Sequence, residues 1–147
     1  MFKRSYFWIL SFFLLIACQM DQRATEHPII TETATNDVMN QTIANTAVRS
    51  VLEKEEVIRA NAVNTDKLLL LAFEVEQFER FNLKSIQKEI KKQLDEEFKD
   101  KQVTASYDPK IMLEIEKLQA KIESKQIDEK KFKKEVKRIV KLHKEKT

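Results

Sequence analysis

The residue with the clearest chemical role in this sequence is Cys18, the only cysteine among 147 residues. It follows Leu15, Ile16 and Ala17, so an aliphatic residue stands three positions before the thiol and a small residue stands directly before it. This is the arrangement in which a diacylglyceryl transferase attaches lipid to a cysteine sulfur. A sulfur consumed as a thioether cannot form a disulfide, which fits an exported chain without a second thiol.

The residues before Cys18 have the layout of an export signal. Lys3 and Arg4 precede thirteen uncharged residues that end at Ala17. This run is shorter than the roughly 20 apolar residues that a bilayer-spanning helix needs. The segment Leu15–Cys18 resembles the bacterial lipobox, which implies a signal peptide over residues 1–17 and an N-terminus anchored in a membrane by at least two acyl chains, such as palmitate. The alternative is that Cys18 only ends a signal peptide that is cleaved elsewhere.

Other residue types that carry out catalysis are sparse. The chain has no glycine, which excludes the glycine-rich phosphate loops and the serine elbow of hydrolases. His27 lies in a polar segment and His143 lies near the C-terminus, so neither has a neighbourhood in the sequence that would shift its pKa. The sequence therefore predicts no catalytic residues, no metal site and no cofactor, and a protein that is not an enzyme.

Two pairs of acidic residues are the remaining candidates for chemistry. Glycosidases use paired carboxylates, but no aromatic sugar platform accompanies these pairs. The first pair, Glu74/Glu76, is interpreted as the exposed edge of a strand, and the second pair, Glu96/Glu97, as part of a helix face. A hydrolase built on Glu74 or Glu76 is kept as an alternative.

Residues 18–41 are expected to form a lipidated, flexible tether. They are rich in Thr, Asn, Gln and Asp, contain Pro28, and show no sustained periodicity. A flexible segment of about 23 residues has a mean reach of roughly 25 Å.

Hydrophobic periodicity predicts six elements in residues 42–124. In chain order they are a helix over 42–54, strands over 57–63 and 68–75, a helix from the N-cap Asn82 to about Lys99, a strand over 103–107 and a helix that starts after the cap Asp108 and contains Ile122. This order predicts an α+β fold: a small two-layer sandwich in which helices cover one face of a mixed three-stranded sheet.

The alternation of side chains predicts which residues face the core. In the strand over 57–63, Ile58, Ala60 and Ala62 share one face, and Arg59 and Asn61 lie on the other. The strand over 68–75 is apolar on both faces, so it is expected at the centre of the sheet. The predicted core residues are Leu71, Phe73, Ile90, Leu94, Ile115 and Leu118.

Residues 125–147 form a basic C-terminal helix or tail, with ten Lys and Arg residues against four acidic residues. Asp128 is a predicted cap, and an apolar stripe follows the helix at Ile127, Phe132, Val136, Ile139 and Val140. Two interpretations stay open: a solvated helix docked through its stripe, or a helix that adheres to anionic lipid or wall polymer, where each cation contributes about 1 kcal/mol. The candidate contact residues are Lys130, Lys131, Lys133, Lys134, Lys137, Arg138 and Lys141. Nucleic acid is not expected as a partner, because Phe132 is the only aromatic residue among these cations.

Four features together resemble the YhcN/YlaJ family of sporulation lipoproteins from endospore-forming Gram-positive bacteria. They are the lipobox ending at Cys18, the segment Val57–Val63, the apolar segment Leu68–Val75 and the segment Val103–Pro109. The likeness covers about residues 42–124. The family pattern has a glycine before the first strand and another after the last helix, where this chain has Glu55-Glu56 and Ser124-Lys125.

The resemblance implies a non-enzymatic lipoprotein that is made during sporulation, exported, and anchored by lipid to a cell or spore membrane. It further implies a contribution to spore germination or outgrowth and an unidentified partner protein in the spore membrane. The alternative is a general cell-envelope lipoprotein that contacts anionic lipid or wall polymer and is unrelated to sporulation.

Overall fold

The computed structural model describes residues 39–146. In chain order the elements are α1 (Thr42–Leu52), β1 (Val57–Asn64), β2 (Leu68–Val75), the 3₁₀ helix η2 (Gln77–Asn82), α2 (Leu83–Glu97), β3 (Gln102–Ser106), α3 (Pro109–Glu123) and α4 (Glu129–Lys146). The predicted α+β class and the predicted order of helices and strands are confirmed. The helix η2 was not predicted.

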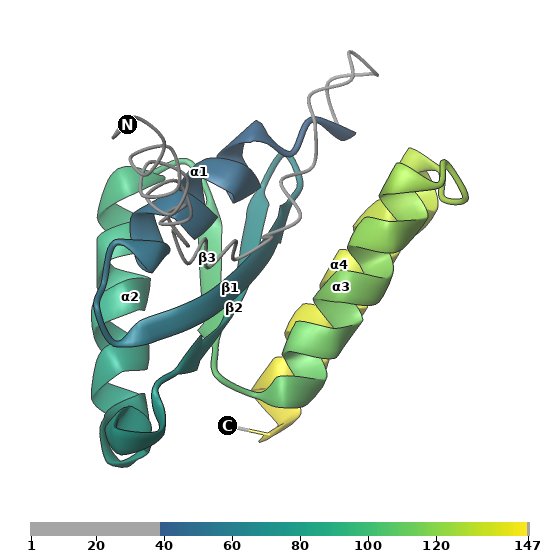
Figure 1. The fold of residues 1–147 in the computed structure, drawn as a ribbon. Coiled ribbons are helices and arrows are strands. Elements are labelled where there is room, and N and C mark those ends of the chain that lie inside the picture. The colour runs from purple at the N-terminus through teal and green to yellow at the C-terminus, as the bar shows by residue number, and fades with distance from the viewer. Residues whose placement is uncertain (1–38, 147) are drawn as a thin grey trace, which may run out of the picture.

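The three strands form one mixed sheet in the order β1-β2-β3 (Figure 1). Strand β1 pairs with β2 in antiparallel register, and β2 pairs with β3 in parallel register. The central position predicted for β2 is confirmed. Leu69, Leu71 and Phe73 are buried on one face of β2, whereas Leu70 and Ala72 are buried on the other.

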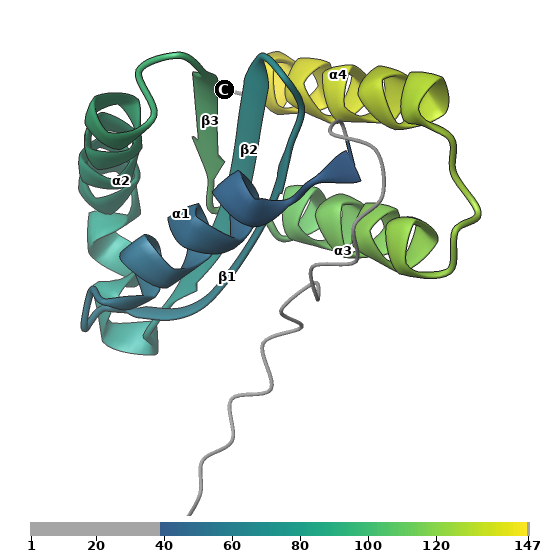
Figure 2. The ribbon, with the colours of Figure 1, turned by 90° about the horizontal axis from the view of Figure 1, so that it is seen from above.

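Helices cover both faces of the sheet. Figure 2 shows α1 and α2 on one side of the strands and α3 and α4 on the other. The structure differs here from the predicted two-layer sandwich, because it has two cores and three layers. The physical reason lies in β2: a strand that is apolar on both faces needs a helix layer on each side to remove both sets of side chains from water.

The predicted core residues are all buried, but they belong to different cores. Leu71, Phe73, Ile90 and Leu94 lie in the first core, between the sheet and helices α1 and α2. The remaining two, Ile115 and Leu118, lie in the second core, between the sheet and helices α3 and α4. Periodicity therefore identified the buried face of each helix correctly, but not the face of the sheet that each helix covers.

Ile58 is the exception among the residues predicted to face inward. Its relative exposure is 49%, whereas the neighbouring Val57 is buried. The register between β1 and β2 shifts between Val57 and Arg59, which leaves Ile58 as the additional residue of a β-bulge. The bulge interrupts the simple alternation, so Val57, Ala60 and Ala62 face the first core instead of Ile58, Ala60 and Ala62.

Two of the three predicted helix caps are confirmed. The Asp108 Oδ1 atom accepts a hydrogen bond of 2.8 Å from the Lys110 N–H, with Pro109 at the first helical position. The Asp128 Oδ1 atom accepts a bond of 2.8 Å from the Lys131 N–H. Asn82 precedes α2, but its side chain donates to Glu79 instead of capping the helix. The 3₁₀ helix η2 leads directly into α2, so this helix does not begin at an isolated cap.

Helix α4 is a wall of the second core. Its predicted apolar stripe is buried at Phe132, Val136, Ile139 and Val140, and partly buried at Ile127. An ion pair between Arg138 and Glu114 joins α4 to α3. The packed part of the chain thus extends beyond residue 124, and the basic helix is part of the fold rather than an appendage.

Candidate functional site

Side-chain amides bond to outward backbone groups at both edges of the sheet. At the β1 edge, the Gln41 side-chain amide accepts from the Asn64 N–H (2.9 Å) and donates to the Asn64 carbonyl (3.0 Å). The Gln119 Nε2 atom donates to the Ala62 carbonyl at 3.0 Å. Side-chain amides thus occupy the backbone positions that another strand would use. Such protection of an edge prevents pairing with other chains.

The β3 edge is also largely covered, because Val103 and Ala105 have relative exposures of only 4% and 2%. The Gln102 N–H donates to the Lys67 carbonyl next to β2 at 2.8 Å. Because successive residues of a strand direct their backbone groups to opposite sides, the backbone groups of Val103 and Ala105 face away from β2. The Ala105 carbonyl accepts a bond of 2.7 Å from the Gln87 Nε2 atom of α2. Gln87 thus occupies an outward carbonyl of β3, as Gln119 occupies one of β1.

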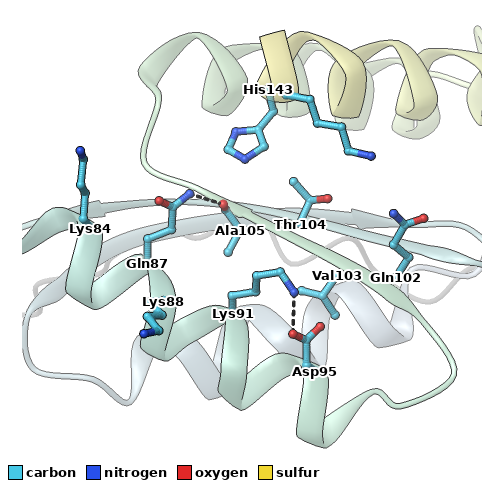
Figure 3. Close-up of a pocket in the computed structure, with 11 residues that line it drawn as sticks. Lys84, Gln87, Lys88, Lys91, Asp95, Gln102, Val103, Thr104, Ala105 and His143 are labelled. Atoms are coloured by element: carbon cyan, nitrogen blue, oxygen red, sulfur yellow. Dashed lines mark hydrogen bonds and ion pairs between the residues drawn. The ribbon is translucent and has the colours of Figure 1, made fainter. Parts of the chain in front are cut away.

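A groove of about 600 Å³ runs along this edge, between α2 and the end of α4. Figure 3 shows Lys84, Gln87, Lys88 and Lys91 on the α2 side and His143 on the α4 side, with β3 between them. The groove is therefore built by two consecutive elements, α2 and β3, and by the end of α4, which is distant from them in the sequence.

The charge of the groove is mostly positive. Four lysines line it, together with one carboxylate, Asp95. Asp95 forms an ion pair with Lys91, one turn earlier on α2. Lys84, Lys88 and Lys144 are exposed at its rim. A concave surface lined by charges of one sign concentrates ligands of the opposite sign, so this groove is suited to anionic groups.

His143 has a defined environment in the folded chain, which corrects the sequence-based interpretation. Burial lowers the pKa of its imidazole below the ordinary value, and Lys144 lowers it further, while Asp108 acts in the opposite direction. Burial thus favours the neutral form of this side chain. The sequence could not indicate this environment, because it depends on the packing of the end of α4 beside β3.

The predicted contact residues of α4 divide into two groups. The first group takes part in ion pairs within the chain: Arg138 with Glu114 and Glu135, Lys133 with Asp66 and Glu129, Lys131 with Asp128, and Lys141 with Glu145. The hydrogen bond from Arg138 lowers the pKa of the Glu114 carboxyl. Two of these cations, Arg138 and Lys133, thus join α4 to residues of other segments.

The second group comprises Lys130, Lys134 and Lys137, which are all exposed. They recur at spacings of four and three residues, so they form a stripe on the face of α4 opposite the buried Phe132 and Val136. The structure thus brings three of the seven predicted residues together on one outward face.

An exposed aromatic pair lies on η2. Phe78 and Phe81 have relative exposures of 87% and 96%. A 3₁₀ helix has three residues per turn, so both rings lie on the same side of η2. Sequence reasoning missed this surface. The signal was present in the segment Gln77–Asn82, where two phenylalanines stand three residues apart among polar residues.

The acidic pairs occupy ordinary surface positions. Glu74 lies 3.4 Å from the Arg59 guanidinium, and Glu97 accepts a hydrogen bond from the Ser50 hydroxyl. Within residues 39–146, no three His, Cys, Asp or Glu side chains are grouped so that they could hold a metal ion. Over the same residues, no helix has the length and apolar character needed to cross a membrane. The lipobox residues Leu15, Ile16, Ala17 and Cys18 lie outside the described part of the chain.

The model of the family described as sporulation lipoprotein YhcN/YlaJ matches residues 19–141 of this sequence. The chain belongs to the YhcN/YlaJ family. The match begins directly after Cys18 and ends within α4, so it includes the whole sheet and both helix layers of this YhcN/YlaJ protein. No curated protein and no solved structure matches the chain.

The turn after α3 has one special backbone position. Lys125, which follows Ser124, has a φ angle of 55°. The Lys125 N–H bonds to the Ile122 carbonyl, and the Gln126 N–H bonds to the Lys121 carbonyl. These bonds form a Schellman motif, in which glycine is favoured at the left-handed position. The chain adopts this left-handed conformation with a lysine at the position.

Proposed function

We propose that this YhcN/YlaJ protein is a non-enzymatic interaction module, anchored by lipid to a membrane of the spore, that contributes to germination or outgrowth. Family membership supports its association with spores as a lipoprotein. The observation that carries the proposal is the basic groove between α2, β3 and the end of α4, because its lysines offer cations to an anionic ligand. The partner would be an unidentified protein of the spore membrane.

The lipid anchor is the first part of this proposal to test. Cys18 stands directly before the segment that the family model matches, and Leu15–Ala17 supply the lipobox pattern. Cys18→Ala should release the protein from the membrane fraction or leave its signal peptide uncleaved. Mass spectrometry of the N-terminal peptide measures the modification directly. An unmodified Cys18 in the wild-type membrane fraction would refute the anchor.

The role in the spore is tested by deletion and complementation. A strain that lacks the gene should germinate or grow out more slowly than its parent, measured by the loss of optical density after addition of a germinant. The wild-type chain should restore the rate, and Cys18→Ala should not. Immunodetection in the separated membranes of dormant spores then locates the protein. A deletion strain with unchanged germination and outgrowth would refute this role.

We also propose that the outer stripe of α4 contacts anionic lipid or wall polymer. The support is the common outward face of Lys130, Lys134 and Lys137. A protein already held at the membrane has a high effective concentration there, so weak charge contacts would be largely formed. This contact would hold the domain against the surface to which its lipid is attached.

The α4 contact is tested with vesicles that contain 0 to about 40% phosphatidylglycerol, at low and high salt. Replacing Lys130, Lys134 and Lys137 by Gln should weaken binding, and salt should weaken the binding of the wild type because the Debye length is only about 8 Å at physiological ionic strength. The matched control replaces three exposed lysines elsewhere: Lys92, Lys99 and Lys117. Equal losses in both triple variants would show that net charge alone acts and would refute the α4 site.

A further inference from the structure

We propose that η2 inserts Phe78 and Phe81 into the interface of an anionic lipid bilayer, while the cations that follow the two rings contact lipid phosphates. This contact goes beyond the proposed anchor at Cys18 and the proposed stripe of α4, because it uses another surface and adds an apolar contact. Its support comes from the exposure of the rings, the charges beside them and the small area that they offer.

The two rings of η2 are the most exposed large apolar side chains in residues 39–146. Their relative exposures are 87% and 96%, whereas that of Ile58, the next in order, is 49%. Ile58 lies at the same end of the sheet, because the neighbouring Val57 pairs with Val75 and η2 begins directly after Glu76. Apolar side chains in water are stabilised when another apolar phase covers them. The end of the sheet at η2 therefore carries a small apolar surface that is suited to such a phase.

The side of η2 that carries the rings continues into a basic face of α2. Lys84 follows Phe81 by three residues, and Lys88 follows Lys84 by four, so these residues lie along one side of the joined helices. Arg80 is exposed next to Phe81. Within residues 39–146, neither Lys84 nor Lys88 forms an ion pair, whereas Lys91 is paired with Asp95. Rings followed by unpaired cations are typical of a helix that lies in a lipid interface, with its apolar groups about 5–10 Å deep.

A lipid surface fits this patch better than a second copy of the chain does. Two phenylalanine side chains bury about 300–500 Å². Each partner in a stable protein interface buries about 800 Å². In a symmetric dimer the cations beside the rings would also face their own copies and repel them. The chain belongs to a family of lipoproteins, and anionic headgroups complement these cations.

The length of chain before the domain permits this contact. Figure 1 shows the start of α1 and the segment between β2 and α2 at opposite ends of the domain. Residues 19–38 separate Cys18 from the described part of the chain, and a segment of this length spans at most roughly 70 Å. Strand β2 has 8 residues and is thus about 26 Å long. The rings can therefore reach the membrane in which a lipid on Cys18 would be anchored.

Tryptophan fluorescence measures insertion in the full chain, purified from membranes and reconstituted into vesicles of phosphatidylglycerol and phosphatidylcholine with brominated acyl chains. Bromine quenches an indole only when the indole enters the bilayer. Phe81→Trp should be quenched at least about twofold more than the control Gln126→Trp. The control places the same indole at the exposed turn between α3 and α4, away from η2 (Figure 1). The unsubstituted chain supplies the background signal, and flotation of the vesicles measures the lipid anchor separately.

Charge variants test the role of the cations beside the rings. In the Phe81→Trp chain, replacing Lys84 and Lys88 by Gln should reduce the quenching by about twofold in vesicles that contain phosphatidylglycerol. The same replacement should have no effect in vesicles of phosphatidylcholine alone. The matched control replaces two exposed lysines elsewhere, Lys99 and Lys117, and should leave the quenching unchanged. Circular dichroism of each variant verifies that the fold is intact.

Three results would overturn the proposed insertion. Equal quenching of Phe81→Trp and Gln126→Trp would show that the rings stay outside the bilayer. Equal effects of the two lysine pairs would show that the cations beside the rings have no specific role. Dimers in analytical ultracentrifugation that Phe81→Ser dissociates would show that a second copy covers the rings. The lipid anchor and the role in germination would stand in each case, because flotation and complementation measure them independently.

Discussion

Replacing Phe132 by alanine tests whether α4 is an integral part of the fold. Phe132 has a relative exposure of 0% and lies in the second core with Leu70 and Ile115. Truncating a buried phenylalanine to alanine lowers the free energy of unfolding by about 3–5 kcal/mol. Alanine has a better helix propensity, which offsets this loss by about 0.5 kcal/mol at most. We therefore expect a net loss of about 3–4 kcal/mol. Small domains have a total stability of only about 5–15 kcal/mol, so this is a large fraction.

Urea unfolding followed by circular dichroism measures this loss. With a slope of about 1.5 kcal/mol per molar urea, the midpoint of Phe132→Ala should fall by about 2 M. The matched control is Lys134→Ala, two residues further along the same helix and exposed. This variant should change the free energy of unfolding by no more than about 0.5 kcal/mol.

The two variants must differ for the reasoning to hold. A loss below about 1 kcal/mol for Phe132→Ala, or a loss equal to that of Lys134→Ala, would show that α4 does not pack in the second core. The predicted division of the chain at residue 124, with α4 as an appendage, would then be the better description.

Three further predictions concern single positions. Lys125→Gly should stabilise the chain by about 0.5–1 kcal/mol, because its φ of 55° strains any side chain with a Cβ atom, and a lower urea midpoint would contradict this. Burial lowers the pKa of His143, so the unfolded chain binds this proton more readily and stability should fall as pH decreases from about 7.5 to 5.5, through the ordinary pKa of 6.5. His143→Gln should reduce this decrease in the urea midpoint, and an identical pH dependence in both proteins would disprove the assignment. Replacing both exposed rings, Phe78 and Phe81, by serine should change the free energy of unfolding by about 0.5 kcal/mol or less, whereas a loss above about 2 kcal/mol would mean that the rings are packed.

Local patterns in the sequence predicted the elements well because their causes are local. The alternation of β2 and the caps Asp108 and Asp128 depend on residues next to each other in the chain. The layering could not be predicted in this way. An amphipathic helix carries a buried face, but nothing in α3 itself specifies which side of β2 it covers. The bulge at Ile58 was missed for a related reason, since it depends on the register with β2.

The candidate site was less predictable than the fold. Its lysines on α2 looked like an ordinary solvated helix face, and His143 looked like a residue in a charged tail. Only the path of the chain brings them to the same strand edge. The role of Gln87 was equally hidden, because its bond to the Ala105 carbonyl joins residues of different elements. Charge and exposure can be estimated from a sequence, whereas the convergence of distant elements cannot.

The position of α4 as the last of the described elements has a consequence for folding during synthesis. The second core cannot be completed before Phe132, Val136 and Ile139 have been synthesised, because they supply its outer wall. One face of the central strand therefore lacks its full cover until α4 has been synthesised. A domain whose second core is closed by α4 stays open for longer during synthesis. The order of the elements along the chain thus delays the completion of the fold.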